Sequence, residues 1–311
     1  MSERSRISRR QLLGGAAALA IVPRVIGGRL TAAERAATHG RVKQSVCFWC
    51  FNSAGEKWDV DTTCRVAKDL GCVSVELVDP AEWGTLKKYG LTCAIAMNGI
   101  SGVPFAKGYN NPRYHDEVVA GAKKMIDASA AGGCPNVIAF TGYKWHDADD
   151  PKSGEIPRDE ATKNCVTGLK QVAGYAEKKG VTVCLEHLNT RDHTHPMKGH
   201  PGYQGDDLDW VAGIIRQVGS PRVRLLFDIY HVQVMHGDLI RRIEQTKDII
   251  GHVHTAGCPG RGELDDRQEV NYPAVLRKLL AVGYAGYVGQ EFIPTRAPRD
   301  GLREAVKLCD V

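Results

Sequence analysis

The chain has 311 residues, of which 43% are hydrophobic, enough to bury the core of one large barrel or of two ordinary domains. Its 41 Lys and Arg residues exceed its 36 Asp and Glu residues by a formal net charge of +5. Because this excess is small and part of it lies before residue 42, the charge does not predict a nucleic-acid-binding surface.

An arginine pair near the N-terminus is followed by an apolar stretch. Arg9 and Arg10 precede the apolar run 12–22, a pattern that is typical of a twin-arginine export signal. The run is short for a bilayer span, so no stable membrane insertion is expected. The sequence predicts an exported, periplasmic or extracytoplasmic protein, and a cytoplasmic one if the segment is only a basic tail. Whether the segment is cleaved stays open.

After a linker that ends near residue 41, apolar strand patterns alternate with amphipathic helix patterns. The predicted strands are 45–50, 73–77, 92–98, 136–141, 182–188, 223–228, 250–255 and 287–292. The predicted helices are 60–70, 114–131, 159–179, 207–218, 239–246 and 272–281. This alternation predicts an α/β protein with a single-domain (β/α)₈ TIM barrel over residues 42–311. A doubly wound sheet is disfavoured because no Gly-rich phosphate loop follows the first strand.

The ten cysteines fall mostly within these predicted strands and helices, which is typical of small buried apolar side chains rather than of disulfides. Cys47 and Cys50 have the spacing of a redox motif. We expect this pair to lie inside a strand and not at the start of a helix, which disfavours a redox role.

Four apolar runs in the second half end in a residue that can bind a metal ion, namely Glu186, Asp228, His254 and Glu291. Barrel enzymes present their catalytic groups at the C-terminal ends of the strands, so we expect these four side chains to meet. Three carboxylates and one imidazole suit one divalent cation, with Mn²⁺ or Mg²⁺ preferred and Co²⁺ or Zn²⁺ as alternatives.

Several of these residues also have a purely structural interpretation. Glu186 could be an exposed carboxylate at a strand end, and Glu291 could form an inter-strand salt bridge. His252 lies two residues before His254 and points to the same side of the strand. We expect His252 to pack beneath His254 and to donate a hydrogen bond, and a second metal ion bound by both histidines is the alternative.

A loop with three histidines follows the fifth predicted strand. His193, His195 and His200 could bind a further ion, although an ordinary surface loop is favoured. Other residues that follow strand ends could line a pocket, with core packing as the alternative for the aromatic ones. These residues are Trp49, Phe51, Asn98, Lys144 and Trp145.

The sequence resembles the hydroxypyruvate isomerase group of the xylose-isomerase-like barrels, within the superfamily of AP endonuclease 2 and sugar isomerase-epimerase proteins. The resemblance covers roughly residues 42–296 and is carried by seven motifs. These motifs are Leu185–Arg191, His200–Tyr203, Phe227–His231, His252–Gly257, Pro259–Leu264, Asn271-Tyr272 and Gln290–Phe292.

The resemblance implies that one divalent ion is held by Glu186, Asp228, His254 and Glu291. It further implies that two of these ligands, Glu186 and Glu291, transfer protons. The substrate would be held by His231 and Arg261. Hydroxypyruvate isomerases often have Gln at the position of His254, whereas the related ketose 3-epimerases have His, so the resemblance leaves the substrate open.

The residues support the same chemistry without the resemblance. A cation that chelates an α-hydroxycarbonyl compound acidifies its carbon-bound proton and stabilises an enediolate. Carboxylates on either side of that plane can remove and return the proton. Arg261 and Arg191 are the candidates to bind a substrate carboxylate, and solvated loop arginines are the alternative.

We therefore expect a metal-dependent isomerase with a small-molecule substrate, most simply one that converts hydroxypyruvate to tartronate semialdehyde. The alternatives are a ketose 3-epimerase or an inosose epimerase or dehydratase on the same site. Two further alternatives are an endonuclease-type phosphodiesterase, which needs several metal ions and a basic groove, and a non-catalytic sugar-binding protein. The sequence leaves open whether the chain forms a homo-oligomer.

Overall fold

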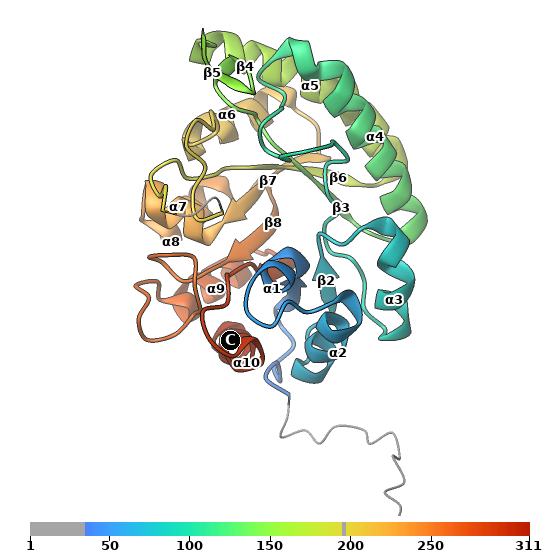
Figure 1. The fold of residues 1–311 in the computed structure, drawn as a ribbon, viewed down its shortest axis with the longest axis vertical. Coiled ribbons are helices and arrows are strands. Elements are labelled where there is room, and N and C mark those ends of the chain that lie inside the picture. The colour runs from blue at the N-terminus through green and yellow to red at the C-terminus, as the bar shows by residue number, and fades with distance from the viewer. Residues whose placement is uncertain (1–34, 195–196) are drawn as a thin grey trace, which may run out of the picture.

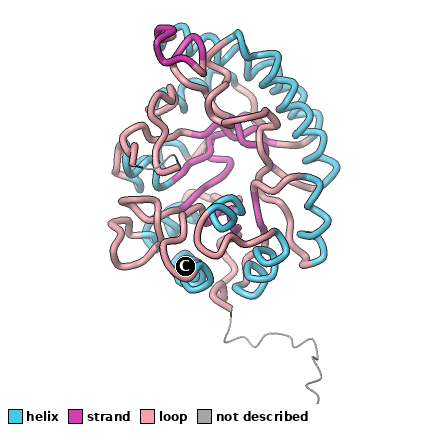
Figure 2. The backbone as a smooth tube through the Cα atoms, in the orientation of Figure 1, coloured by secondary structure: helices cyan, strands magenta, loops and turns pink. Residues whose placement is uncertain are grey.

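The computed structural model describes residues 35–194 and 197–311, so the predicted export signal lies outside the described residues. Seven parallel strands form a curled sheet at the centre of the molecule, with the helices around it (Figures 1 and 2). The strand order is β2-β1-β9-β8-β7-β6-β3. The strands are β1 (Lys43–Cys47), β2 (Ser74–Glu76), β3 (Asn136–Ala139), β6 (Thr182–Glu186), β7 (Val223–Asp228), β8 (Ile250–Thr255) and β9 (Tyr287–Gln290).

The gap between β2 and β3 is closed by the predicted strand 92–98, which does not form a regular strand. Thr92 makes a parallel bridge to β2, and Ala96 makes one to β3. The buried side chain of Asn136 donates a hydrogen bond of 2.9 Å to the carbonyl of Ala94. These contacts complete the predicted eight-position (β/α)₈ barrel.

Six of the helices that cover the barrel begin and end close to where the hydrophobic periodicity predicts, whereas those at Trp83–Lys88 and Pro298–Cys309 are not predicted. In α2, Asp59 caps the first turn and Gly71 ends the helix in the left-handed conformation at φ 91°. The covering helices are α2 (Val60–Leu70), α3 (Trp83–Lys88), α4 (His115–Gly132), α5 (Arg158–Lys179), α6 (Leu208–Val218), α8 (Leu239–Thr246), α9 (Tyr272–Ala281) and α10 (Pro298–Cys309). Short 3₁₀ helices occupy Pro80–Glu82 and Pro112–Tyr114.

Additional elements follow several strands at their C-terminal ends. The helices α1 (Phe48–Ser53) and α7 (Ile229–Met235) come directly after β1 and β7. A hairpin of β4 (Trp145–Asp147) and β5 (Asp150–Glu155) follows β3. Neither the short helices nor the hairpin is predicted from the sequence pattern. Among the described residues, no helix has the length and apolar character needed to cross a membrane.

The prediction that the first strand runs to residue 50 is wrong. The strand ends at Cys47 and α1 begins at Phe48, which lets Phe51 turn into the core and stack on Trp58 with ring centroids 5.1 Å apart. The Cys47–Cys50 pair therefore lies at the start of a helix. Burial raises the pKa of both thiols, so they stay protonated, as unreactive buried cysteines do. All ten cysteines are buried and free.

We expect Asn136→Ala to lower the free energy of unfolding by about 1–3 kcal/mol, because the buried Ala94 carbonyl loses its hydrogen-bond donor. Chemical denaturation measures this change. Lys88→Ala, at the exposed end of α3, is the control and should change stability by less than about 0.5 kcal/mol. Equal stability of the two variants would contradict the role of Asn136 in closing the barrel.

Candidate metal centre and pocket

The four predicted metal ligands come together at the C-terminal end of the barrel. Glu186 and Asp228 end β6 and β7, His254 lies in β8, and Glu291 directly follows β9. One ligand atom of each lies within 4.8 Å of the other three, and all four side chains are buried. The neighbouring strands place their last residues at one edge, which is why residues far apart in sequence meet here.

The donor atoms of this cluster suit a divalent cation. Glu186 Oε1, Asp228 Oδ2 and His254 Nδ1 are buried and make no hydrogen bond. His254 Nδ1 also lies 2.9 Å from Glu291 Oε2 and 3.7 Å from Glu186 Oε1. Buried polar atoms without partners are costly, and a cation at their common centre would satisfy all of them. The same atoms supply the oxygen-rich donor set that Mn²⁺ or Mg²⁺ prefers.

The pKa values of the three acids in the cluster are shifted in different directions. Burial raises the pKa of Asp228 to about 7 and raises that of Glu186. Burial acts in the same direction on Glu291, but the attraction of His254 and Arg261 outweighs it and holds the Glu291 pKa well below its usual range. For His254, burial is outweighed by Glu291, Glu186 and Glu76, so its pKa is raised. A cation would therefore displace protons from this cluster.

Backbone and side-chain hydrogen bonds fix the orientation of the acids. Asp228 caps α7, where its Oδ1 accepts from the backbone N–H groups of Tyr230 at 2.7 Å and His231 at 3.2 Å, which leaves Oδ2 to face the cluster. Glu291 Oε1 accepts from the indole N–H of Trp49 at 2.9 Å, and its Oε2 accepts from Arg261 at 2.5 Å. These bonds hold the carboxylates in place from outside the cluster.

Arg261 points into the acid cluster. It is 2% exposed, its Nη2 lies 3.5 Å from Asp228 Oδ2, and another guanidinium N–H donates to the carbonyl of Met197. Its guanidinium lies over the ring of Trp49 at 5.2 Å. Its backbone adopts φ 54°, a left-handed conformation that is uncommon for a long side chain. Such a costly conformation at the site indicates that the direction of this side chain matters.

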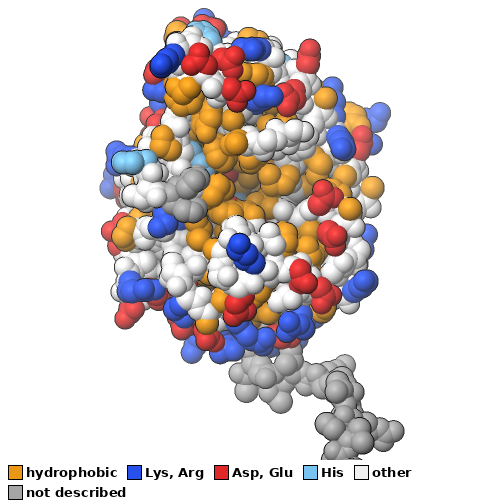
Figure 3. All heavy atoms as spheres, in the orientation of Figure 1, with side chains coloured by type: hydrophobic (Ala, Val, Ile, Leu, Met, Phe, Trp, Pro, Cys, Tyr) orange, Lys and Arg blue, Asp and Glu red, His pale blue; other side chains and the backbone are white. Residues whose placement is uncertain are grey.

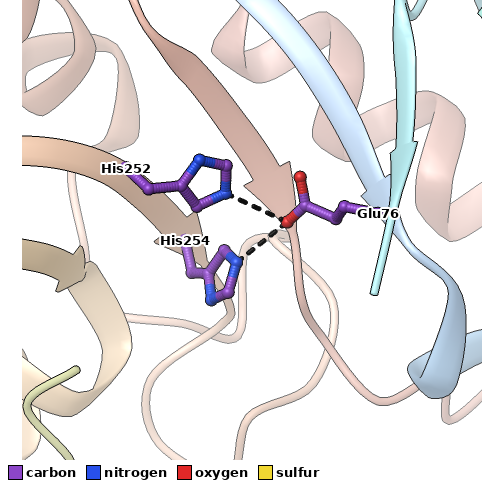
Figure 4. A group of neighbouring side chains, drawn as sticks. All are labelled: Glu76, His252 and His254. Carbon is purple, nitrogen blue, oxygen red and sulfur yellow. Dashed lines mark hydrogen bonds and ion pairs between the residues drawn. The ribbon is translucent and has the colours of Figure 1, made fainter. Parts of the chain in front are cut away.

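A fourth carboxylate, Glu76, which the sequence analysis missed, contacts His254 and His252 (Figure 4). Glu76 Oε1 lies 2.8 Å from His254 Nε2 and 3.2 Å from His252 Nε2, and all three side chains are fully buried. Burial opposes ionisation of Glu76, but the two histidines outweigh it and hold its pKa at about 2. Because an ionised carboxylate only accepts, both histidines donate from Nε2, and His254 turns Nδ1 toward the other three ligands.

His252 thus lies beneath His254 and donates a hydrogen bond, as expected. The space for the carboxylate depends on Gly289, where an added Cβ would lie 2.0 Å from Glu76 Oε1. A sequence signal for Glu76 exists, because this acid interrupts the apolar run 73–78 in the same way as Asp228 interrupts its own strand.

The other predicted substrate residues are more scattered. His231 is buried behind Asp228, with its Nε2 3.5 Å from Asp228 Oδ2 and its Nδ1 accepting from Asn189. Asn98 donates to the carbonyl of Pro104, and Arg191 donates to the carbonyl of Val234 outside the pocket. Substrate binding by these side chains stays a prediction.

Of the remaining residues that were predicted to line a pocket, only some do so. Trp49 lines the pocket described below, whereas Phe51 lies in the core. Lys144 forms an exposed ion pair with Glu155, and Trp145 packs against Tyr143.

The three-histidine loop does not form one cluster in the described residues. His193 is exposed and His200 is buried against Phe105, with ring centroids 4.3 Å apart. His195 lies outside the described residues.

A pocket of about 520 Å³ opens above the cluster, and hydrophobic side chains gather around the hollow on this face (Figure 3). Glu186, Glu291 and Arg261 line this pocket, whereas Asp228 and His254 lie behind its wall. Two of the four acid and imidazole groups, Glu186 and Glu291, are therefore exposed to a molecule bound in the pocket.

Residues 64–310 match the model of a protein family that is described as "xylose isomerase-like TIM barrel". The chain belongs to this family. Over 180 residues, 57% of the chain and 66% of the relative, it is 31% identical to a 2-oxo-tetronate isomerase of Cupriavidus necator. It is 30% identical to the hydroxypyruvate isomerase of Escherichia coli over 138 residues, 44% of the chain and 50% of that protein. The match thus spans two thirds or less of either relative.

Among solved structures, this xylose isomerase-like barrel is similar to a Brucella melitensis protein described as an AP endonuclease of family 2. The TM-score is 0.70 at 25% identity, and the match covers 84% of the chain and 97% of the Brucella protein.

We expect the affinity of the cluster for Mn²⁺ to rise with pH. Asp228, with a pKa of about 7, and the protonated His254 must both lose protons to bind a cation, so affinity should fall at least about tenfold per pH unit below about 7. Isothermal titration calorimetry in buffers of different ionisation enthalpy measures both the affinity and the protons released. Affinity that is constant between pH 6 and pH 8 would contradict this assignment.

Glu76→Gln should weaken Mn²⁺ binding by roughly 10- to 100-fold, because the charged acceptor that orients His254 is lost. His254→Gln provides a background in which the ligand is an amide oxygen without tautomers. Adding Glu76→Gln to that background should change affinity by no more than about threefold. Equal losses in both backgrounds would mean that Glu76 acts on the barrel as a whole and not through His254. Glu160→Gln, on the exposed face of α5, is the control.

Proposed function

We propose that the protein is a metal-dependent isomerase that transfers a proton between the adjacent carbons of an α-hydroxycarbonyl compound. One observation carries this proposal: four ligand atoms converge within 4.8 Å at the base of a pocket, and two of the carboxylates also face the pocket. The names of the relatives from Cupriavidus necator and Escherichia coli support the same reaction class.

A divalent cation held by Glu186, Asp228, His254 and Glu291 would supply positive charge that acidifies the carbon-bound proton and stabilises the enediolate. Mn²⁺ or Mg²⁺ suits this donor set best. Asp228 and His254 do not line the pocket, so they would act as ligands.

Glu186 and Glu291 are the proton-transfer groups in this proposal. Burial raises the pKa of Glu186, which makes this carboxyl a better proton acceptor than an exposed one, and it would return the proton to the neighbouring carbon. Glu291 is held ionised by Arg261 and His254 and would act as the base on the other side. The same two groups would serve an epimerase, in which one carboxylate removes the proton and the other, in its protonated form, delivers a proton to the opposite face of the same carbon.

The phosphodiesterase alternative finds less support in the site. Among the described residues that line the pocket, Arg261 is the only Lys or Arg, and it is paired with Glu291. A basic groove for a phosphodiester backbone would need several free cations. Glu76, His252 and His254 could form a second metal-binding group, but they share His254 with the first.

The proposal is tested by solvent exchange. The Mn²⁺-loaded chain should incorporate deuterium from D₂O into hydroxypyruvate at its hydroxyl-bearing carbon, measured by NMR, and chelation should stop the exchange. Glu186→Gln should slow exchange by about 100-fold or more because the proton carrier is lost. Metal content measured on the same sample separates loss of the cation from loss of the carboxyl, and Glu160→Gln is the control. Ligand binding without any exchange would support a non-catalytic sugar-binding protein instead.

A further inference from the structure

The pocket is larger than a three-carbon acid requires. Its volume of about 520 Å³ falls within the range of roughly 300–1,000 Å³ that holds drug-sized ligands. Glu186 and Glu291 are the two carboxylates of its lining, and most of the other lining side chains are apolar.

The wall beyond the cluster is apolar and comes from separate segments of the chain. Phe48 and Ile293 follow β1 and β9, and Leu77 follows β2 with a left-handed backbone at φ 56°. Phe105, Phe140 and Leu188 complete this apolar wall. Figure 3 shows hydrophobic side chains around the hollow on this face. Apolar surface that faces a reactive site is typical of ligand contact.

The described lining offers no free cation to a substrate carboxylate. The guanidinium of Arg261 already contacts Glu291, Asp228 and the carbonyl of Met197. His200 is the lining histidine, and burial lowers its pKa to about 3, so it is neutral. Apart from the ion that the acid cluster would hold, the described lining therefore provides apolar contacts more readily than a charged partner.

We propose that the substrate is an α-hydroxycarbonyl compound with a bulky apolar substituent. This inference rests on the proposed function. The reacting carbons lie against Glu186 and Glu291, and the substituent lies against the apolar wall. A proton leaves the hydroxyl-bearing carbon and is held on a carboxylate. When it returns to the former carbonyl carbon, the hydroxyl proton passes to the former carbonyl oxygen and the hydroxyl-bearing carbon becomes the new carbonyl, so the reaction needs no oxidant or reductant.

Two probes with the same reacting end test this inference. Hydroxyacetone and 1-hydroxy-4-phenylbutan-2-one both present a ketone beside a CH₂OH group, and they differ only in the apolar tail. The full chain with Mn²⁺ is incubated with each in D₂O, and deuterium incorporation at the CH₂OH carbon is followed by NMR. We expect kcat/KM to be about 10- to 100-fold higher for the phenyl compound, because its tail is removed from water.

A variant with a charged side chain tests whether the preference for the phenyl compound depends on the apolar wall. Ile293→Asp places an acid in the apolar wall and should lower the preference for the phenyl compound at least about tenfold. Val73→Asp, at a residue 45% exposed on β2's flank, should leave the preference unchanged. Retention of the full preference by Ile293→Asp would overturn the assignment of the apolar wall.

The outcomes separate this inference from the proposed function. Exchange of both probes at equal kcat/KM would overturn the substrate class and leave the isomerase function standing. A higher kcat/KM for hydroxypyruvate than for the phenyl compound would do the same. Absence of exchange with both probes and with hydroxypyruvate, in a chain shown to hold Mn²⁺, would overturn the function and the inference together.

Discussion

The structure depends on how negative charge is compensated at one end of the barrel. Glu76, Glu186, Asp228 and Glu291 are all buried there, and isolated carboxylates do not remain ionised in such surroundings. Arg261 offsets part of this charge, and the histidines offset another part. Burial still raises the pKa of Asp228 and Glu186, so the compensation from the protein alone is incomplete. A divalent cation is the simplest group that completes it.

The site divides into an inner and an outer part with different origins. The inner part consists of strand ends, capped and hydrogen-bonded so that Asp228 and His254 each turn one atom toward a common centre. The outer part comes from segments that follow the strands, including α1 and the turn with Arg261. Rigid strands fix the ligand geometry, whereas loops and short helices set the shape of the pocket. In the proposed function, the strand ends therefore determine the type of reaction, and the segments that follow them determine the choice of substrate.

The barrel and the meeting of the four residues of its acid cluster could be predicted because both leave local signals in the sequence. A polar residue that ends an apolar run identifies Asp228, and the same signal at Glu76 would have added the support beneath His254. The direction of Arg261 could not be predicted, since it depends on a left-handed backbone and on contacts with Trp49. The helix at Phe48–Ser53 was missed because a run of apolar residues fits a strand as well as a short buried helix. The apolar wall comes from distant segments and has no sequence period.

Gly289 and the carboxylate of Glu76 occupy adjoining space, with only 2.0 Å between that oxygen and any Cβ at position 289. Even an alanine there would push the carboxylate off the imidazole. Among descendants of this chain, substitutions at residues 76 and 289 should therefore depend on each other. A side chain larger than glycine at position 289 becomes acceptable only after Glu76 has been replaced by a smaller residue. A glycine in the barrel wall thereby restricts which substitutions can be accepted at the end of the barrel that holds the acid cluster.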